Sequence, residues 1–389
     1  MSMKEEALAI KDYIISQRRY IHAHPELSTK EYETTKHIAS ELKNMGIETV
    51  TFSDITGLVG IINGGQHGRT VMLRADIDAL PIKEPQDKPY SSQNTGVMHA
   101  CGHDGHASML LGAAKLLQAH RNDIRGTVKL LFQMGEEIGR ASENYVKNGS
   151  LDDTDAIFGM HIWPLIESGK ANFEEGERMA SSDRFEITIH KHSYDNNSYP
   201  NQDTIAAAAS VVLGLQAIVS RINDPRNSLV ISVGMMNGGE NAETTSDKTE
   251  LIGTVRTFDR EFRKKIPMII EKIANDAAAI YNCTAELKYT FLPGPVINED
   301  QTLAEIAQSA TRKVLGKTGL VSFNKVLGAE DFSVLMEKKP GVFGFLGTFN
   351  KKKGITGSLH HPLFDIDEDI LPNGAAIYAQ FAIDYLNNQ

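Results

Sequence analysis

The nine residues Met98–His106 constrain this chain more than any other segment of its sequence. They read Met-His-Ala-Cys-Gly-His-Asp-Gly-His, so histidine, cysteine and aspartate side chains stand close together, with two glycines between them. Thiolate, imidazole and carboxylate groups are the side chains with which proteins bind borderline divalent metals. The alternative is a loop with scattered histidines and a buried cysteine. Two further clusters of metal-binding residue types farther along the chain favour a metal site.

Three successive predicted strands lead into side chains of this chemistry. The segments are residues 71–73 before Asp76 and Asp78, residues 127–132 before Glu136 and Glu137, and residues 157–160 before His161. A helix is predicted from Gly105 to His120, so strands and helices alternate here. Such alternation predicts a mostly parallel sheet with helices on both faces. Because ligands of such sheets collect at the carboxyl ends of the strands, we expect these side chains to lie together.

Glu136 and Glu137 are adjacent carboxylates, and neighbours on a strand or turn point in different directions. One can therefore bind a metal while the other faces a water molecule, a division that suits hydrolysis. A solvated acidic turn is the alternative for such a pair taken alone. His161 alone is more often a satisfied, partly buried histidine, and in the tandem pair His360-His361 one member is expected to lie on the surface or behind the ligands.

The pattern changes near Ser181 and predicts an inserted domain. Alternating strands at 185–189, 229–235, 250–256 and 285–291 are interleaved with helices at 204–221 and 262–281. This β-α-β-β-α-β order is that of a ferredoxin-like α+β domain. We therefore predict an α/β fold with a main domain in two parts, residues 1–180 and 293–389, and a ferredoxin-like satellite or lid domain at residues 181–292.

Charge limits the partners. The 389 residues include 40 Lys and Arg and 50 Asp and Glu, a formal net charge of −10. This argues against a nucleic-acid backbone or an anionic membrane as the main partner. We also expect no signal peptide, and no apolar run of the roughly 18 residues that a membrane span needs.

Cysteine usage points to a reducing compartment. The chain has two cysteines, Cys101 and Cys283, too few for a disulfide framework, so a cytoplasmic location is predicted. Cys283 stands in a predicted turn of the insert and is expected to be a structural thiol.

Eight motifs, in order along nearly the whole chain, carry a resemblance to a known family. They are His24–Leu27 (His-Pro-Glu-Leu), Leu73–Ile82 (Leu-Arg-Ala-Asp-Ile-Asp-Ala-Leu-Pro-Ile), Met98–His106, Glu136-Glu137, Gly159–Pro164 (Gly-Met-His-Ile-Trp-Pro), Gly253–Thr257 (Gly-Thr-Val-Arg-Thr), Glu330–Phe332 (Glu-Asp-Phe) and His360–Pro362 (His-His-Pro). The chain resembles metal-dependent amidohydrolases of the hippurate hydrolase, N-acyl-amino-acid deacylase and auxin-conjugate hydrolase group, related to carboxypeptidase G.

The resemblance implies a catalytic site with two divalent ions, manganese or zinc. By position, the ligands it implies are Cys101, His103, Glu137, His161 and His360. Cys101 is able to bridge both ions, and His360 is favoured over His361 because the family's ligand stands two residues before the proline. Glu136 would be the general base and acid, and Asp76 and Asp78 would hold the ligands from behind.

The insert departs from the family pattern. The usual Gly-Gly-His is absent, and His190 and His192 stand nearby at the wrong spacing to replace it. The usual Asn-Val-Ile-Pro is also absent, and Glu243 stands near its Asn position. A carboxylate there would repel an anionic substrate terminus. Arg256 is the candidate for binding a substrate carboxylate, and a structural ion pair is the alternative.

The sequence therefore predicts an aminoacylase- or carboxypeptidase-type metallohydrolase. Its predicted substrates are N-acyl amino acids or related small amides and peptides. The alternative is a repurposed or non-catalytic member that binds metal and ligand through an altered lid. A homodimer through the satellite domain is a further expectation, with 229–235 as an edge strand able to pair with its copy.

Overall fold

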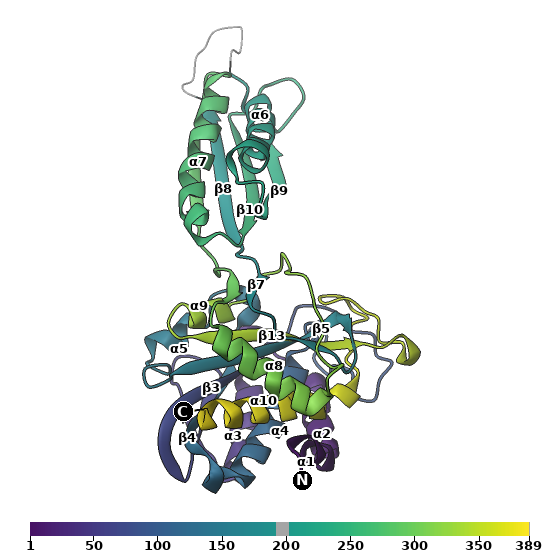
Figure 1. Cartoon of the computed structure of the whole chain (residues 1–389). Coiled ribbons are helices and arrows are strands. Elements are labelled where there is room, and N and C mark those ends of the chain that lie inside the picture. The colour runs from purple at the N-terminus through teal and green to yellow at the C-terminus, as the bar shows by residue number, and fades with distance from the viewer. Residues whose placement is uncertain (192–201, 389) are drawn as a thin grey trace. The chain divides into compact units, whose positions relative to one another are not determined.

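The chain folds into two units, each described here by itself. A computed structural model describes residues 1–191 and 202–388 of the chain (Figure 1). The first unit comprises Met1–Arg178, Ile297–Asn324 and Asp331–Gln389, and the second comprises Met179–Val296 and Lys325–Glu330. The insert predicted at residues 181–292 falls within the second unit.

The first unit is built on a seven-stranded mixed sheet with the strand order β1-β2-β4-β3-β5-β13-β6. The strands are β1 (Glu48–Thr51), β2 (Leu58–Asn63), β3 (Gln66–Asp76), β4 (Arg125–Gln133), β5 (Ala156–Glu167), β6 (Ala171–Asn172) and β13 (Gly341–Phe349). The four central strands β4, β3, β5 and β13 are parallel, and the flanking pairs are antiparallel. The central strands are buried almost throughout, as the continuous apolar runs in their sequences require.

Helices cover both faces of this sheet, which confirms the predicted fold class. They are α1 (Met3–Ala9), α2 (Lys11–Ala23), α3 (Tyr32–Asn44), α4 (His103–Ala119), α5 (Glu143–Lys147), α8 (Gln301–Leu315), α9 (Phe332–Met336) and α10 (Leu371–Asn387). Phe158 of β5 stacks on Phe381 of α10, with ring centroids 4.2 Å apart. The next residue, Gly159, faces the ring of Phe332 in α9. Because neighbouring strand residues point to opposite faces, α10 and α9 lie on opposite sides of β5.

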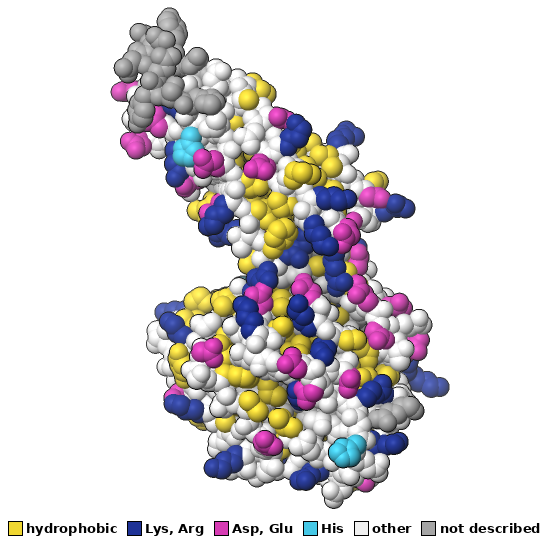
Figure 2. Space-filling view, turned by 90° about the vertical axis from the view of Figure 1, so that its left-hand side faces the viewer, with side chains coloured by type: hydrophobic (Ala, Val, Ile, Leu, Met, Phe, Trp, Pro, Cys, Tyr) yellow, Lys and Arg dark blue, Asp and Glu magenta, His cyan; other side chains and the backbone are white. Residues whose placement is uncertain are grey.

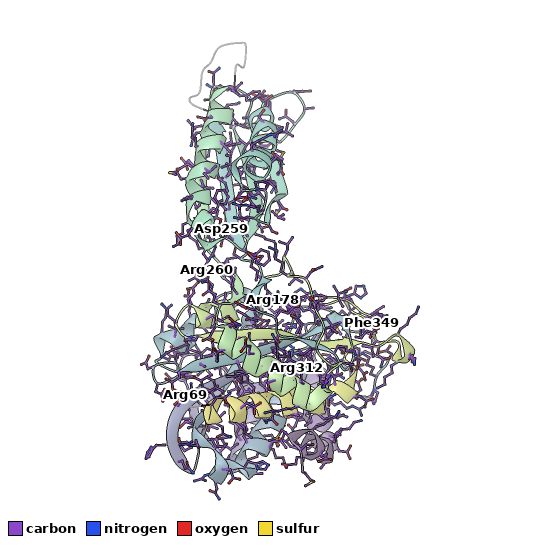
Figure 3. The ribbon with its side chains drawn as sticks, in the orientation of Figure 1. Arg69, Arg178, Asp259, Arg260, Arg312 and Phe349 are labelled. Carbon is purple, nitrogen blue, oxygen red and sulfur yellow. The ribbon has the colours of Figure 1, made fainter. Side chains whose placement is uncertain are left out.

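The end of the chain is tied back to the sheet. Arg69 in β3 donates to the carbonyl oxygen of Tyr385 at 2.9 Å, and its guanidinium carbon lies 4.4 Å from the centre of the Tyr385 ring (Figure 3). The hydroxyl of Tyr378 donates to the carbonyl oxygen of Arg74 at 2.7 Å. These contacts hold α10 against β3, whose carboxyl end carries Asp76.

The second unit has a four-stranded antiparallel sheet with the order β11-β8-β10-β9. Its elements are β8 (Asp183–Lys191), α6 (Thr204–Ala217), β9 (Leu229–Gly238), β10 (Lys248–Thr257), α7 (Arg260–Ala279) and β11 (Cys283–Thr290). Both the element order and the strand order are those of a ferredoxin-like domain. Asp259, labelled in Figure 3, caps α7 by accepting from the amides of Glu261 and Phe262 at 3.0 and 2.8 Å. A two-stranded sheet of β7 (Gly176–Met179) and β12 (Val296–Asn298) lies where the chain passes between units.

The expectation about apolar runs was wrong for one segment. The helix Thr204–Ile222, which joins α6 to a π-helical turn at Ile218–Ile222, is long and apolar enough to cross a membrane, with a mean hydropathy of 1.8. Ala207, Val211 and Leu215 nevertheless pack in the core of the second unit. Several alanines and one glycine, which break up the run of larger apolar residues, conceal its length in the sequence.

On the face of the molecule drawn in Figure 2, Lys and Arg side chains are interspersed with Asp and Glu on both units. The space-filling view of this face therefore has no large area of a single charge.

The contact of β5 with α10 generates a test of the core. Phe158 is fully buried in the main cluster, so Phe158→Ala is expected to lower the free energy of unfolding by about 3–5 kcal/mol. Leu165 lies on the same strand and is 72% exposed. Leu165→Ala is the matched control and is expected to change the value by less than about 0.5 kcal/mol. Denaturant unfolding followed by circular dichroism measures both, and equal losses would contradict this packing.

Candidate metal centre

The five side chains predicted as ligands lie together in the first unit, although they come from distant parts of the chain. Cys101 precedes α4, His103 is the first residue of α4, Glu137 lies in the 3-10 turn Glu136–Ile138 after β4, and His360 follows β13. His161 lies inside β5, which does not end there as expected but continues to Glu167. Asp76, which ends β3, pairs in register with Gln133, which ends β4, so both strands stop at the same level. The carboxyl ends of the parallel strands thus bring the donors together, as expected for an α/β sheet.

Cys101 is at the centre of the arrangement. Its sulfur lies 3.4 Å from Nε2 of His161 and 3.3 Å from Nε2 of His360. Two groups of possible ligands share it: Cys101, His103 and His161, and Cys101, Glu137 and His360. Within each group the ligand atoms all lie within 4.8 Å of one another. A thiolate at this position is able to serve both groups.

Hydrogen bonds fix the orientation of two of the histidine rings. Nδ1 of His161 lies 2.7 Å from the carbonyl oxygen of Ile162. Because a carbonyl oxygen can only accept a hydrogen bond, Nδ1 carries the proton. Nδ1 of His103 lies 3.1 Å from Oδ1 of Asp78 and donates to this carboxylate. Each ring therefore turns Nε2, the nitrogen with a lone pair in the neutral form, toward the group.

The acidic side chains around Cys101 favour the binding of cations. Burial, with Glu137, Glu136 and Asp76 nearby, raises the pKa of the Cys101 thiol well above its usual value. Nε2 of His103 is buried without a hydrogen-bond partner among the described residues, and Oε1 of Glu137 lies 3.2 Å from Nε2 of His360. Buried polar atoms without partners are costly, and sulfur, imidazole and carboxylate donors together suit divalent metals. The residues present therefore fit a metal site.

His103 and His161 differ in charge when no metal is bound. Burial lowers the pKa of His103, but Asp76 and Asp78 outweigh burial and raise it to about 10. Burial and the neighbouring His106 lower the pKa of His161 well below its usual value. A metal at Nε2 of His103 must therefore displace a proton.

The two adjacent histidines have different surroundings. His360 has a positive φ of 60°, an uncommon conformation for a residue with a side chain, and its amide donates to Ala100, the residue before Cys101, at 2.8 Å. Backbone strain of this kind gathers at functional sites. Nδ1 of His361 instead accepts from the amide of Leu363 at 3.1 Å. The structure thus brings His360, the favoured candidate, to the group.

The carboxylates predicted behind the ligands, Asp76 and Asp78, lie next to His103. Oδ1 of Asp76 lies 3.8 Å from Nε2 of His103. Asp78 accepts from the amides of Glu136 and Glu137, each at 3.1 Å, and from His103. Asp78 therefore links a ring of one predicted ligand to the turn that carries another.

Sequence reasoning missed the role of His106. Its Nδ1 lies 2.5 Å from Oδ1 of Asp76, and its Nε2 accepts from the amide of Ile162 at 2.8 Å. Both nitrogens are thus used to join α4 to β3 and β5. The three-residue spacing from His103 to His106 could have placed the two rings side by side on one helix face, but the partner on β5 is visible only in the fold.

A buried ionic network holds the start of α4. Nε of Arg18 donates to Oδ2 of Asp104 at 2.7 Å, and Nδ1 of His22 lies 2.8 Å from the same oxygen. All three side chains are fully buried. Burial raises the pKa of Asp104, but Arg18 and His22 outweigh it and hold the pKa well below its usual range. The network fixes α4 directly next to His103.

The candidates of the insert belong to the second unit. Arg256 of β10 donates to the carbonyl oxygen of Leu327 at 2.6 Å. The amide of exposed Glu243 donates to Oδ1 of Asn241 at 3.0 Å. His190 lies in β8, opposite Lys248 and Thr284, and His192 lies outside the described residues. The substrate-binding role of Arg256 stays a prediction.

Comparisons with known proteins agree on one family. The model of Peptidase family M20/M25/M40 matches residues 72–384. The chain is 39% identical to IAA-amino acid hydrolase ILR1-like 2 of Arabidopsis thaliana, over 97% of this chain and 86% of that protein. It is 38% identical to N-acetylcysteine deacetylase of Bacillus subtilis, over 95% and 96%. A solved structure of the Bacillus subtilis YXEP protein, described as a dinuclear metal binding peptidase, matches with a TM-score of 0.87 and 36% identity over 98% and 99% of the two chains.

The network around Asp104 generates a test of pH dependence. Because the folded pKa of Asp104 lies below the unfolded value, its contribution to stability is present above about pH 4 and is lost as the pH falls. Asp104→Asn is expected to lower the free energy of unfolding at neutral pH by about 3–5 kcal/mol and to flatten its fall with acid. Urea unfolding of metal-free protein over a pH series measures this.

The matched control for that series is Asp123→Asn. The Asp123 side chain is 87% exposed, so the variant is expected to follow the wild type within about 0.5 kcal/mol at every pH. If the free energy of unfolding of Asp104→Asn falls with acid in parallel with that of the wild type, the Asp104 ion pair does not cause the loss of stability at low pH.

Proposed function

The chain belongs to Peptidase family M20/M25/M40, and on this premise we propose that it is a metal-dependent hydrolase that cleaves the amide bond of N-acyl amino acids. The observation that carries the proposal is the convergence of five donors of divalent metals beside a buried carboxylate, Glu136, that belongs to neither group sharing Cys101. The names of the two relatives, an amino-acid conjugate hydrolase and an N-acetyl amino-acid deacetylase, support this substrate class.

Cys101, His103, Glu137, His161 and His360 would hold two ions, with Cys101 shared. The description of the Bacillus subtilis structure as dinuclear supports this number. When bound, divalent ions supply Lewis acidity that favours attack of water on an amide carbonyl. Manganese and zinc both suit this donor set of sulfur, nitrogen and oxygen.

Glu136 is placed to move the proton. Its side chain is buried, and the amide of Asp331 donates to its Oε1 at 3.4 Å. It takes a proton from the attacking water as the C–O bond forms, and it delivers that proton to the amide nitrogen as the C–N bond breaks. A carboxylate whose oxygens both bind cations is a poor base. Because the adjacent Glu137 is assigned as a metal ligand, Glu136 is the carboxylate that remains to accept the proton.

Asp76 and Asp78 orient the site. Asp78 accepts from Nδ1 of His103 and so keeps Nε2 directed toward the group, while Asp76 holds His106. Partners of this kind fix the ring and raise the basicity of the ligand. Arg256 in the second unit is proposed to bind the substrate carboxylate. The absence of the Gly-Gly-His and Asn-Val-Ile-Pro motifs favours a changed choice of substrate.

The proposed chemistry is tested with Glu136→Gln. The variant is expected to keep both ions, measured by elemental analysis, and to lose at least about 100-fold in kcat on a panel of N-acyl amino acids. Removal of metal with a chelator is expected to abolish turnover in the wild type, and added Mn²⁺ or Zn²⁺ to restore it. Glu143→Gln, at a surface pair with Arg140, is the matched control and is expected to stay fully active.

The result also separates the second candidate function. If wild type and Glu136→Gln are equally inert on the whole panel while both bind metal, the chain is a ligand-binding member with an altered lid. Turnover by Glu136→Gln at the wild-type rate would contradict the assignment of the base.

We also propose a homodimer through the second unit. β9 is the outer strand of its sheet, and it exposes Met235 and Met236 by 52% and 42%. α6 packs beside β9 and exposes Leu213 by 75%. An open strand edge next to an apolar helix face suits a second copy of the chain, because a two-fold axis pairs the same strand with itself.

Light scattering after size exclusion tests the dimer. The wild type is expected to elute as a dimer, and Leu213→Glu combined with Met235→Lys as a folded monomer, because charges oppose burial of the surface. Met268→Lys changes an apolar α7 side chain that is 69% exposed, and this control is expected to stay dimeric. A monomeric wild type would overturn the proposal.

A cytoplasmic location, supported by the free thiols of Cys101 and Cys283, stays a prediction.

A further inference from the structure

The turn Met134–Glu137 lies between β4 and the residues that carry the proposed chemistry. Each of its four successive amides donates to a side chain. Met134 donates to the hydroxyl of Tyr145 at 3.1 Å, Gly135 to Oε1 of Glu31 at 2.9 Å, and Glu136 and Glu137 to Asp78. These side chains hold the backbone here, because the pairing of β4 with β3 ends at Gln133.

Gly135 is the most demanding position of the turn. It has φ 63° and ψ 32°, in the left-handed region, and an added Cβ would lie 2.9 Å from Cβ of Ala141. Glycine explores many conformations unless something holds it, so the partner of its amide, together with Asp78 on the next two amides, sets the direction in which the side chains of Glu136 and Glu137 leave the turn.

That partner, Glu31, comes from the loop before α3, far from Gly135 in the sequence. It stands at the N-cap position of α3, yet its carboxylate makes no cap hydrogen bond to that helix. The carboxylate accepts instead from the amide of Thr29 at 2.9 Å, from the hydroxyl of Thr56, and from Gly135. Thr29 itself has a positive φ of 66°. The loop before α3 is thus shaped to direct Glu31 away from its own helix.

Keeping a carboxylate at this place is costly. Glu31 is fully buried, and burial raises its pKa to about 7 although the hydrogen bonds from Thr56 and the backbone act in the other direction. Helix capping does not account for this burial, because the carboxylate makes no hydrogen bond to the first turn of α3. A buried polar group that is fully hydrogen-bonded instead specifies one geometry.

We propose that Glu31 is a positioning residue of the hydrolytic site, which holds Gly135 and thereby directs Glu136 toward the substrate and Glu137 toward the metal. This inference rests on the proposed function, which assigns those two roles. Glu31 is far from Glu136 in the sequence, and in this role it acts through the turn without binding substrate or metal itself.

Three substitutions separate position from charge. Glu31→Gln retains a carbonyl oxygen for both amides and can donate to the Thr56 hydroxyl, so kcat is expected to stay within about threefold of the wild type. Glu31→Asp keeps the charge and is a good N-cap, but it is one methylene too short to reach Gly135. For Glu31→Asp and Glu31→Ala we expect kcat to fall about 10- to 100-fold, the usual cost of losing a partner behind a ligand, with KM little changed.

Metal affinity supplies a readout besides turnover. Calorimetric titration of Zn²⁺ into metal-free protein is expected to show a weaker site, by about 10-fold or more, in Glu31→Asp and Glu31→Ala and wild-type affinity in Glu31→Gln. Glu31→Asp keeps the test decisive if Glu31→Ala does not fold.

Glu26→Ala is the matched control. Glu26 lies in the same loop and accepts from the amide of Glu33 and from the amide and hydroxyl of Thr34 at 3.2, 2.8 and 2.9 Å. Its loss is expected to lower the melting temperature while kcat and Zn²⁺ affinity stay at the wild-type level. The positioning role is wrong if Glu31→Asp changes kcat and Zn²⁺ affinity no more than Glu26→Ala does. It is also wrong if Glu31→Gln loses as much kcat and Zn²⁺ affinity as Glu31→Asp. Loss of the proposed function is recognised separately, by full turnover in Glu136→Gln.

Discussion

Burial of several acidic groups around one thiol is the constraint on which the rest of the first unit depends. Cys101, Asp76, Glu136 and Glu137 gather where parallel strands end, and charges of one sign at short distance in a poorly hydrated pocket repel strongly. Part of the compensation comes from the chain, since Arg74 donates to Asp76 at 2.7 Å and lies 3.1 Å from Asp331. The proposed cations would supply the remainder.

The same constraint explains why so many side chains around the pocket are themselves buried and paired. His106 joins Asp76 to β5, Asp78 joins His103 to the turn after β4, and Arg18 with His22 holds Asp104 at the start of α4. The first two links connect elements that carry predicted ligands, and the third ties α4, which begins at His103, to α2. Such hydrogen-bonded support behind the ligands is the arrangement that holds side chains of a metal site in a defined geometry.

Much of the site was predictable because its residue types are unusual and several of them follow or lie in buried strands. Buried strands before Asp76, Glu136 and His161 were visible as apolar runs, and the parallel arrangement followed from alternation with helices. The links were not predictable. Glu31 looks like an ordinary helix start, His106 was one of three histidines in a short run, and the apolar length of Thr204–Ile222 was hidden by small residues.

The sequence by itself determined the chemistry of the donors and the order of the elements. Residue type sets which metals a side chain suits, and hydrophobic periodicity sets which segments form strands and helices. Only the tertiary structure decided that Cys101 is shared by two groups, that His360 and not His361 turns toward them, and that Glu31 reaches Gly135. These facts depend on distances between segments far apart in the chain, and such distances exist only after the sheet has brought its strand ends together.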